Sequence, residues 1–230
     1  MRKTTRAISD ANLTIVRITR TPRQKKGMSV NESQARPPCE CEHDFVLVLT
    51  DIGDLTPGAE DALFEAGCDD ATISVRSGRI FLSFTRMAST LKDAILSAIG
   101  DVGKANIGAH VLRVDDCNLV TQSEIARKIS RSRQLVHQYI TGTRGPGKFP
   151  PPVCGVTDEN PLWAWCDVAY WLRQNDMITE EALRDAQDTA VINSILDFVR
   201  QRQVNPDLFE EVYKLCEEQL SQEPDAAHAE

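Results

Sequence analysis

Between Phe45 and Val114 the chain alternates strand-like and helix-like hydrophobic patterns, and this alternation constrains the fold more than any other feature. Apolar runs or alternating apolar residues predict four strands, at residues 45–49, 71–75, 79–84 and 109–114. A capping residue followed by proline opens a helix that stops at Gly67, and apolar residues at helical spacing follow Thr90. Ser77–Gly78 predicts a hairpin turn. We therefore expect the order strand, helix, strand, strand, helix, strand.

This order is the split β-α-β arrangement of ferredoxin-like domains, so we expect an α+β protein with a ferredoxin-like domain over residues 44–116. The fold hosts many functions, including small-molecule sensing and dimerisation. Its element order therefore does not predict a function. A protein partner that binds through residues 44–116 is one possibility that this fold leaves open.

The segment that begins at Thr121 predicts two short helices separated by a tight turn. Thr121-Gln122-Ser123-Glu124 has the spacing of a capping box, and Ser132 is placed to cap a second helix over residues 132–141. The second helix has a polar, basic outer face, as a helix-turn-helix does. The alternative is a pair of helices packed in an α-rich domain, with its basic residues solvated.

The residues that follow extend this pattern across about 50 residues. The motifs concerned are Ser132–Arg133, Gly142, Phe149-Pro150-Pro151-Pro152, Trp165 and Asp167-Val168-Ala169-Tyr170-Trp171-Leu172. They resemble the excisionase and AlpA-like group of winged helix-turn-helix proteins, within the wider MerR-like class. We expect Trp163 and Trp165 to alternate in a strand and Asp167 to cap the next helix. The chain departs from these proteins in two places. It has Ser130 where they have a glycine in the turn, and its loop from Thr143 to Phe149 is long.

The resemblance implies that the helix over residues 132–141 enters the major groove of DNA. Side chains on its outer face would read base edges, and they are Arg133, Gln134, His137 and Gln138. Residues around it would contact phosphates and add affinity without sequence information, and they are Arg127, Lys128, Arg131, Ser132, Arg144 and Lys148. Arg133 is the leading candidate for reading guanine, because its planar fork matches O6 and N7.

The charge distribution is uneven along the chain. The net charge is −8, yet residues 121–150 carry six Lys/Arg against one Asp/Glu, and residues 1–38 carry nine against two. Residues 151–230 carry five against seventeen. A phosphate backbone responds to local charge density, because salt screens charges beyond about 10 Å. An acidic chain can therefore bind DNA through its basic segment.

The remaining segments complete the predicted organisation. We expect a winged helix-turn-helix over residues 117–175, and two further helices over residues 176–221 that act either as a dimerisation hairpin or as a lid. A homodimer would suit two DNA half-sites. Residues 1–43, a basic segment in which Met28 is an alternative start, and residues 222–230 are expected to be disordered tails.

Other sequence patterns bear on enzyme, metal and membrane functions. The chain has no phosphate-binding loop, Gly-x-Ser-x-Gly or His-Glu-x-x-His, so we expect neither an enzyme nor a cofactor. Cys39-x-Cys41-x-His43 lacks the second ligand pair of a usual zinc site, and we expect no metal. The pairs Asp69–Asp70 and Asp115–Asp116 read as exposed turn residues. With no long apolar run and seven scattered cysteines, we expect a cytoplasmic, nucleoid-associated protein of bacterial type and no membrane contact.

These patterns favour a sequence-specific DNA-binding transcription regulator, in particular a repressor, that binds double-stranded DNA. Two alternatives stay open. One is an architectural factor, similar to an excisionase, that bends DNA. The other is an antitoxin-like protein that represses its own operon and binds a protein partner.

Overall fold

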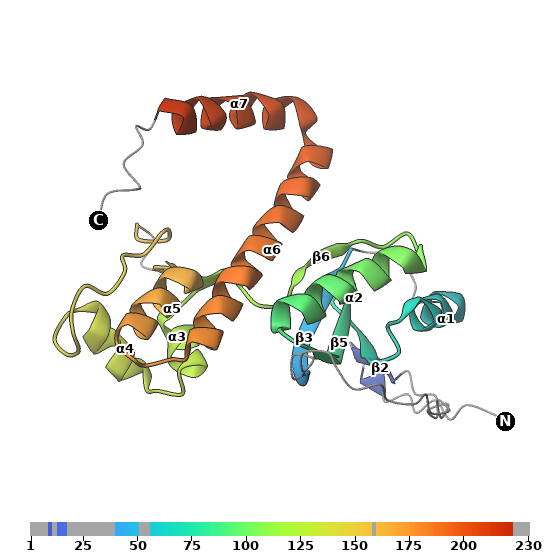
Figure 1. The fold of residues 1–230 in the computed structure, drawn as a ribbon, viewed down its shortest axis with the longest axis horizontal. Coiled ribbons are helices and arrows are strands. Elements are labelled where there is room, and N and C mark those ends of the chain that lie inside the picture. Colours follow the sequence, from blue (N-terminus) through green and yellow to red (C-terminus); the bar gives the residue numbers. More distant parts are fainter. Residues whose placement is uncertain (1–8, 11–12, 18–39, 51–55, 158–159, 223–230) are drawn as a thin grey trace, which may run out of the picture.

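The computed structural model describes residues 9–10, 13–17, 40–50, 56–157 and 160–222, which form a mixed α+β structure with seven helices and two antiparallel sheets (Figure 1). The first part of the chain contains β1 (Ser9–Asp10), β2 (Leu13–Arg17), β3 (Cys41–Leu49), α1 (Pro57–Ala66), β4 (Ala71–Arg76), β5 (Arg79–Ala88), α2 (Leu91–Ala105) and β6 (Val111–Val114). The second part contains β7 (Leu119–Val120), α3 (Gln122–Lys128), α4 (Arg133–Ile140), β8 (Trp163–Ala164), α5 (Trp165–Gln174), α6 (Glu180–Val204) and α7 (Pro206–Gln222).

The larger sheet has the strand order β1-β2-β4-β5-β3-β6, and all its neighbouring strands are antiparallel. From β3 to β6 the elements follow the expected order strand, helix, strand, strand, helix, strand. Alternate residues of β3, namely Phe45, Leu47 and Leu49, are buried in one core with Leu63 of α1 and Ile95 of α2. The two helices therefore cover the same face of the sheet.

Short-range sequence signals determine where these helices and turns begin and end. The Thr56 hydroxyl accepts a hydrogen bond from the Ala59 amide at 3.2 Å, and Gly67 ends α1 with φ +110°. In the β4–β5 hairpin Ser77 and Gly78 both have positive φ, as the tightest hairpin turn requires. β5 continues to Ala88, four residues beyond the predicted strand.

The expected disordered tail over residues 1–43 is wrong for β2, which pairs antiparallel with β4. A strand of five residues needs no core of its own when the edge of an existing sheet offers unpaired backbone groups. β3 also begins at Cys41, ahead of the predicted boundary at residue 44. The other residues of the expected tail, apart from β1, residue 40 and the start of β3, lie outside the described part of the chain.

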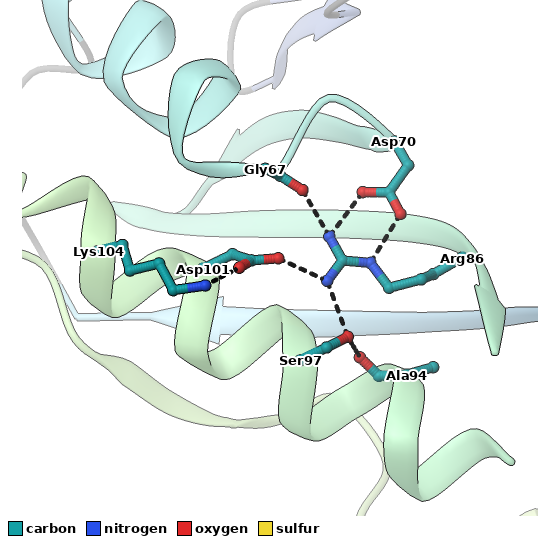
Figure 2. A network of polar contacts seen from close by, with 7 residues as sticks. All are labelled: Gly67, Asp70, Arg86, Ala94, Ser97, Asp101 and Lys104. Carbon is teal, nitrogen blue, oxygen red and sulfur yellow. Dashed lines mark hydrogen bonds and ion pairs between the residues drawn. The ribbon is translucent and has the colours of Figure 1, made fainter. Parts of the chain in front are cut away.

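Arg86, which is 8% exposed, ties the two helices to β5 (Figure 2). Its guanidinium uses all five N–H groups: it donates to both Asp70 carboxylate oxygens, to Ser97 Oγ, to Asp101 Oδ2 and to the Gly67 carbonyl, at 2.7–2.9 Å. These bonds raise the pKa of Arg86 above its usual value, with the hydrogen bond to Asp70 as the largest cause. The expectation that Asp70 is an exposed turn residue is therefore wrong.

The long helix α6 packs against both β6 of the larger sheet and α5 (Figure 1). Near its beginning Leu183 packs with Ala169 of α5. Farther along, the buried Asn193 side chain accepts a hydrogen bond from the Val114 amide at 2.8 Å and donates to the Val114 and Asp116 carbonyls. Asn193 thus occupies the open edge of β6 as a further strand would.

Candidate nucleic-acid interface

The helix α3 begins with the predicted capping box. The Thr121 hydroxyl accepts a hydrogen bond from the Glu124 amide at 3.3 Å, and the Glu124 carboxylate accepts one from the Thr121 amide at 2.7 Å. The bonds from Thr121 lower the pKa of Glu124. Because both partners lie within one turn, the residue types alone predict this helix start.

Ser130 makes the turn between α3 and α4. It has φ +53°, the left-handed conformation that glycine adopts most easily. The next amide, of Arg131, donates to the Ala126 carbonyl at 2.9 Å. The Ser132 hydroxyl then accepts from the Leu135 amide at 3.2 Å and caps α4, as predicted.

An aromatic cluster holds α4 against α5. The ring of Trp171 lies 5.4 Å from that of Tyr139 and 4.9 Å from that of Phe149, between centroids. Phe149 also meets Trp163 edge-on at 6.4 Å. With the fully buried Val136, these residues belong to one core that extends from Val120 of β7 to Leu172 of α5. By packing on α4 they position its polar face.

The glycine-rich loop after α4 is held by backbone contacts to this cluster. The Trp171 indole N–H donates to the Gly147 carbonyl at 2.9 Å, and the Trp163 indole donates to the Pro150 carbonyl at 3.1 Å. At Gly145, where φ is +87°, an added Cβ would lie 2.8 Å from the Tyr139 ring. The loop therefore has a defined path over the cluster.

Two expectations about the start of α5 are wrong. Trp163 pairs with Val120 in a short sheet, but Trp165 is already the first residue of the helix. The Trp165 amide donates to the Asn118 carbonyl at 2.8 Å, where the strand pairing ends. The helix cap is therefore Ala164, whose side chain cannot accept a hydrogen bond, and Asp167 lies in the first turn.

The structure brings the four candidate base-reading residues together on α4. Arg133, Gln134 and His137 are exposed, and Gln138 is half-buried. The Gln122 side-chain amide donates to the Arg133 carbonyl at 2.9 Å and so links the two helices. Among the described residues, no acidic side chain pairs with Arg133.

The candidate phosphate contacts fall into two groups at opposite ends of α4, which is about 12 Å long. Arg127, Arg131 and Ser132 are exposed around the α3–α4 turn, and Arg144 and Lys148 are exposed in the loop beyond the helix. Lys148 also lines an open groove of about 680 Å³ with residues of α5 and α6. Lys148 therefore lies close to α5 and α6.

Lys128 differs from the other candidates because its ammonium already has partners. Its Nζ lies 2.6 Å from Asp116 Oδ1 and 4.9 Å from the centre of the Trp165 ring, and its side chain is 23% exposed. Asp116 is thus the partner in an ion pair and not simply an exposed turn residue. We expect Lys128 to stabilise the domain more than it binds phosphate.

Within the described part of the chain, no three His, Cys, Asp or Glu side chains gather as a metal site would need, although Cys41 Sγ lies 3.2 Å from His43 Nε2. Of the described helices, none has the length and apolar character needed to cross a bilayer. Among known protein families, curated proteins and solved structures, none matches this chain.

Proposed function

We propose that the chain binds double-stranded DNA through a winged helix-turn-helix over residues 117–175 and acts as a transcription regulator, in particular a repressor. The observation that carries this proposal is the outer face of α4, where Arg133, Gln134 and His137 are exposed together while the opposite face packs on an aromatic core. A rigid helix with polar side chains free to bond base edges is what major-groove recognition requires.

The turn before α4 supports the same proposal. Arg127 and Arg131 are exposed beside the Ser132 cap, and the amides at a helix N-terminus favour a negative group. Because these residues lie in the segment with six basic residues against one acidic, the local field attracts phosphate although the whole chain is acidic. This group would set the register of α4 on the duplex.

The topology supports two finer assignments. The strand order β4-β5-β3-β6, with α1 and α2 on one face, favours a ferredoxin-like domain over residues 44–116. The left-handed Ser130 and the cluster around Trp171 favour the excisionase and AlpA-like group for the second domain. In this proposal the first domain carries the sensing or partner-binding function, and the second carries the DNA contacts.

Sequencing the duplexes that the full-length protein retains from a random pool, at moderate salt, tests the proposal. We expect one sequence motif to be enriched. Arg133→Ala should then weaken binding to that motif by roughly 5- to 150-fold and relax the preference at one base pair. Arg184→Ala, which removes an exposed arginine from α6, is the matched control and should leave affinity and motif unchanged.

The other outcomes separate the alternatives. An equal loss for every sequence would make Arg133 a phosphate contact and not a base reader. Binding without an enriched motif would favour a DNA-bending architectural role. No binding to any duplex would overturn the proposal and leave the antitoxin-like, protein-binding function as the candidate.

A further inference from the structure

Exposed apolar side chains concentrate on α6 and α7. Of the seventeen large hydrophobic side chains that are exposed in the described part of the chain, ten lie between Val191 and Leu220. Among the described elements, α6 is the one against which α7 packs substantially, and Figure 1 shows α7 standing away from the sheet and from α3–α5. An apolar surface of this extent marks an interaction site in a water-soluble fold.

The two helices carry apolar rows with the same spacing. The α6 seam consists of Val191, Ile195 and Phe198, and the α7 seam consists of Leu208, Val212 and Leu215. Each row follows the i, i+4, i+7 spacing at which two helices interlock their side chains. Ile195 is 56% exposed and Leu215 is 54% exposed. The α6 seam lies opposite the side of α6 that carries the buried Asn193.

The corner between the helices leaves an open hollow of about 380 Å³, which Leu208 and Val212 of the α7 seam line together with Phe198 of their own α6. Phe209 and Tyr213 pack on Phe198 with ring centroids 4.5 and 6.0 Å away, and Arg202 pairs with Glu210 at 2.9 Å. These contacts use the face of α7 that adjoins the α7 seam. Leu208, Val212 and Leu215 nevertheless remain about half exposed, so the α7 seam is available to another chain.

Charge indicates which surface suits the α7 seam. The helix α7 carries five acidic residues and one lysine, whereas residues 193–204 of α6 carry two arginines and one aspartate. Two α7 helices side by side would repel each other. The exposed half of α6 in a second copy has the opposite net charge and the same apolar spacing.

We propose that two copies of the chain associate reciprocally, with α7 of each copy lying along the exposed half of α6 in the other. The α7 seam of one chain then contacts the α6 seam of its partner, twice in the dimer, as a two-fold axis requires. Residues 191–204 and 206–222 of each copy, 31 residues in all, provide enough surface for the roughly 20–30 residues a side of a stable interface. The proposal goes beyond DNA binding and does not depend on it.

Measuring the mass of the full-length protein in solution by light scattering and sedimentation tests this interface. We expect twice the 25.6 kDa chain mass. The α7 variant Leu208→Glu/Val212→Glu and the α6 variant Val191→Glu/Ile195→Glu should each be monomeric, with helix content by circular dichroism unchanged. Lys214→Glu, which changes the charge of α7 by the same amount away from the seam, should remain dimeric.

Mixing the two monomeric variants gives the decisive result. In the mixed dimer one of the two contacts joins an intact α7 seam to an intact α6 seam, so a dimer with one chain of each kind should reappear. If the α6 variant alone stays dimeric, the contact is not on the α6 seam, and if the α7 variant stays dimeric, it is not on α7. A monomeric wild-type protein would equally overturn the proposal. None of these masses depends on whether DNA binds.

Discussion

At the scale of single residues, Ser130 combines a demanding backbone conformation with an ordinary side chain. A residue other than glycine at φ +53° is strained by roughly 1–2 kcal/mol, and the exposed Ser130 side chain makes no hydrogen bond to any described residue that would offset this. The strain lies at the joint that sets the angle between α3 and α4. The protein therefore tolerates a local cost at the turn that positions α4, the helix proposed to read DNA.

Replacing Ser130 by glycine should raise the free energy of unfolding by about 1 kcal/mol, because glycine adopts the left-handed conformation without strain. Chemical denaturation followed by circular dichroism measures the change. Ser194→Gly, in the interior of α6, should lower stability by about 0.5 kcal/mol or more, because glycine disfavours a helix. Equal effects of both substitutions would show that the turn is not strained.

Residue types predicted local contacts well and distant ones poorly. Thr121 and Ser132 cap their helices as expected, because each bonds an amide three residues ahead. Lys128 was expected to face phosphate, yet its partner Asp116 lies twelve residues upstream. Neither spacing nor hydrophobic period encodes such pairs, so the sequence alone could not separate Lys128 from its exposed neighbours.

At the scale of elements, α6 is predicted as a helix but its role is not. The helix Glu180–Val204 lies within the range 176–221 expected to hold two helices, and the Thr179 hydroxyl caps it by accepting a hydrogen bond from the Ala182 amide at 3.1 Å. That Asn193 completes the β6 edge depends on two segments that meet only after folding. In the sequence, this contact is indicated only by an asparagine among the apolar positions of a helix, because a buried polar side chain needs hydrogen-bond partners.

Asn193→Ala should lower the free energy of unfolding by about 2–3 kcal/mol, because it leaves the Val114 amide and two carbonyls without their partner. The neighbouring exposed Ser194→Ala should change stability by less than about 0.5 kcal/mol. Thermal unfolding of both variants provides the comparison. A loss no greater than that of Ser194→Ala would mean that water replaces the asparagine at this edge.

At the scale of the whole molecule, the salt dependence of DNA binding should show how many basic side chains contact phosphates. If Arg127, Arg131, Arg144 and Lys148 each neutralise one phosphate, the logarithm of affinity should fall with the logarithm of salt with a slope of about −4 per copy. Arg131→Gln should make that slope shallower by about 0.9. Lys128→Gln should leave it nearly unchanged, because its ammonium is bound to Asp116.

Affinity measured from 50 to 200 mM salt for the two variants distinguishes these expectations. Equal changes in slope for Arg131→Gln and Lys128→Gln would show that Lys128 leaves Asp116 when DNA binds. An unchanged slope for both would place the phosphate contacts elsewhere, with the basic residues of the N-terminal segment as the next candidates.

The aromatic cluster beneath α4 also determines the intrinsic fluorescence of the protein. All three tryptophans lie between Trp163 and Trp171 and all three tyrosines lie between Tyr139 and Tyr213, while residues 1–120 contain neither type. The indoles of Trp163 and Trp171 donate to the carbonyls of the loop after α4. Tryptophan fluorescence therefore reports on the segment that contains α3, α4, α5 and the loop after α4, while the larger sheet contributes none. The chain thus carries its own optical probe in the core directly beneath the helix proposed to meet DNA.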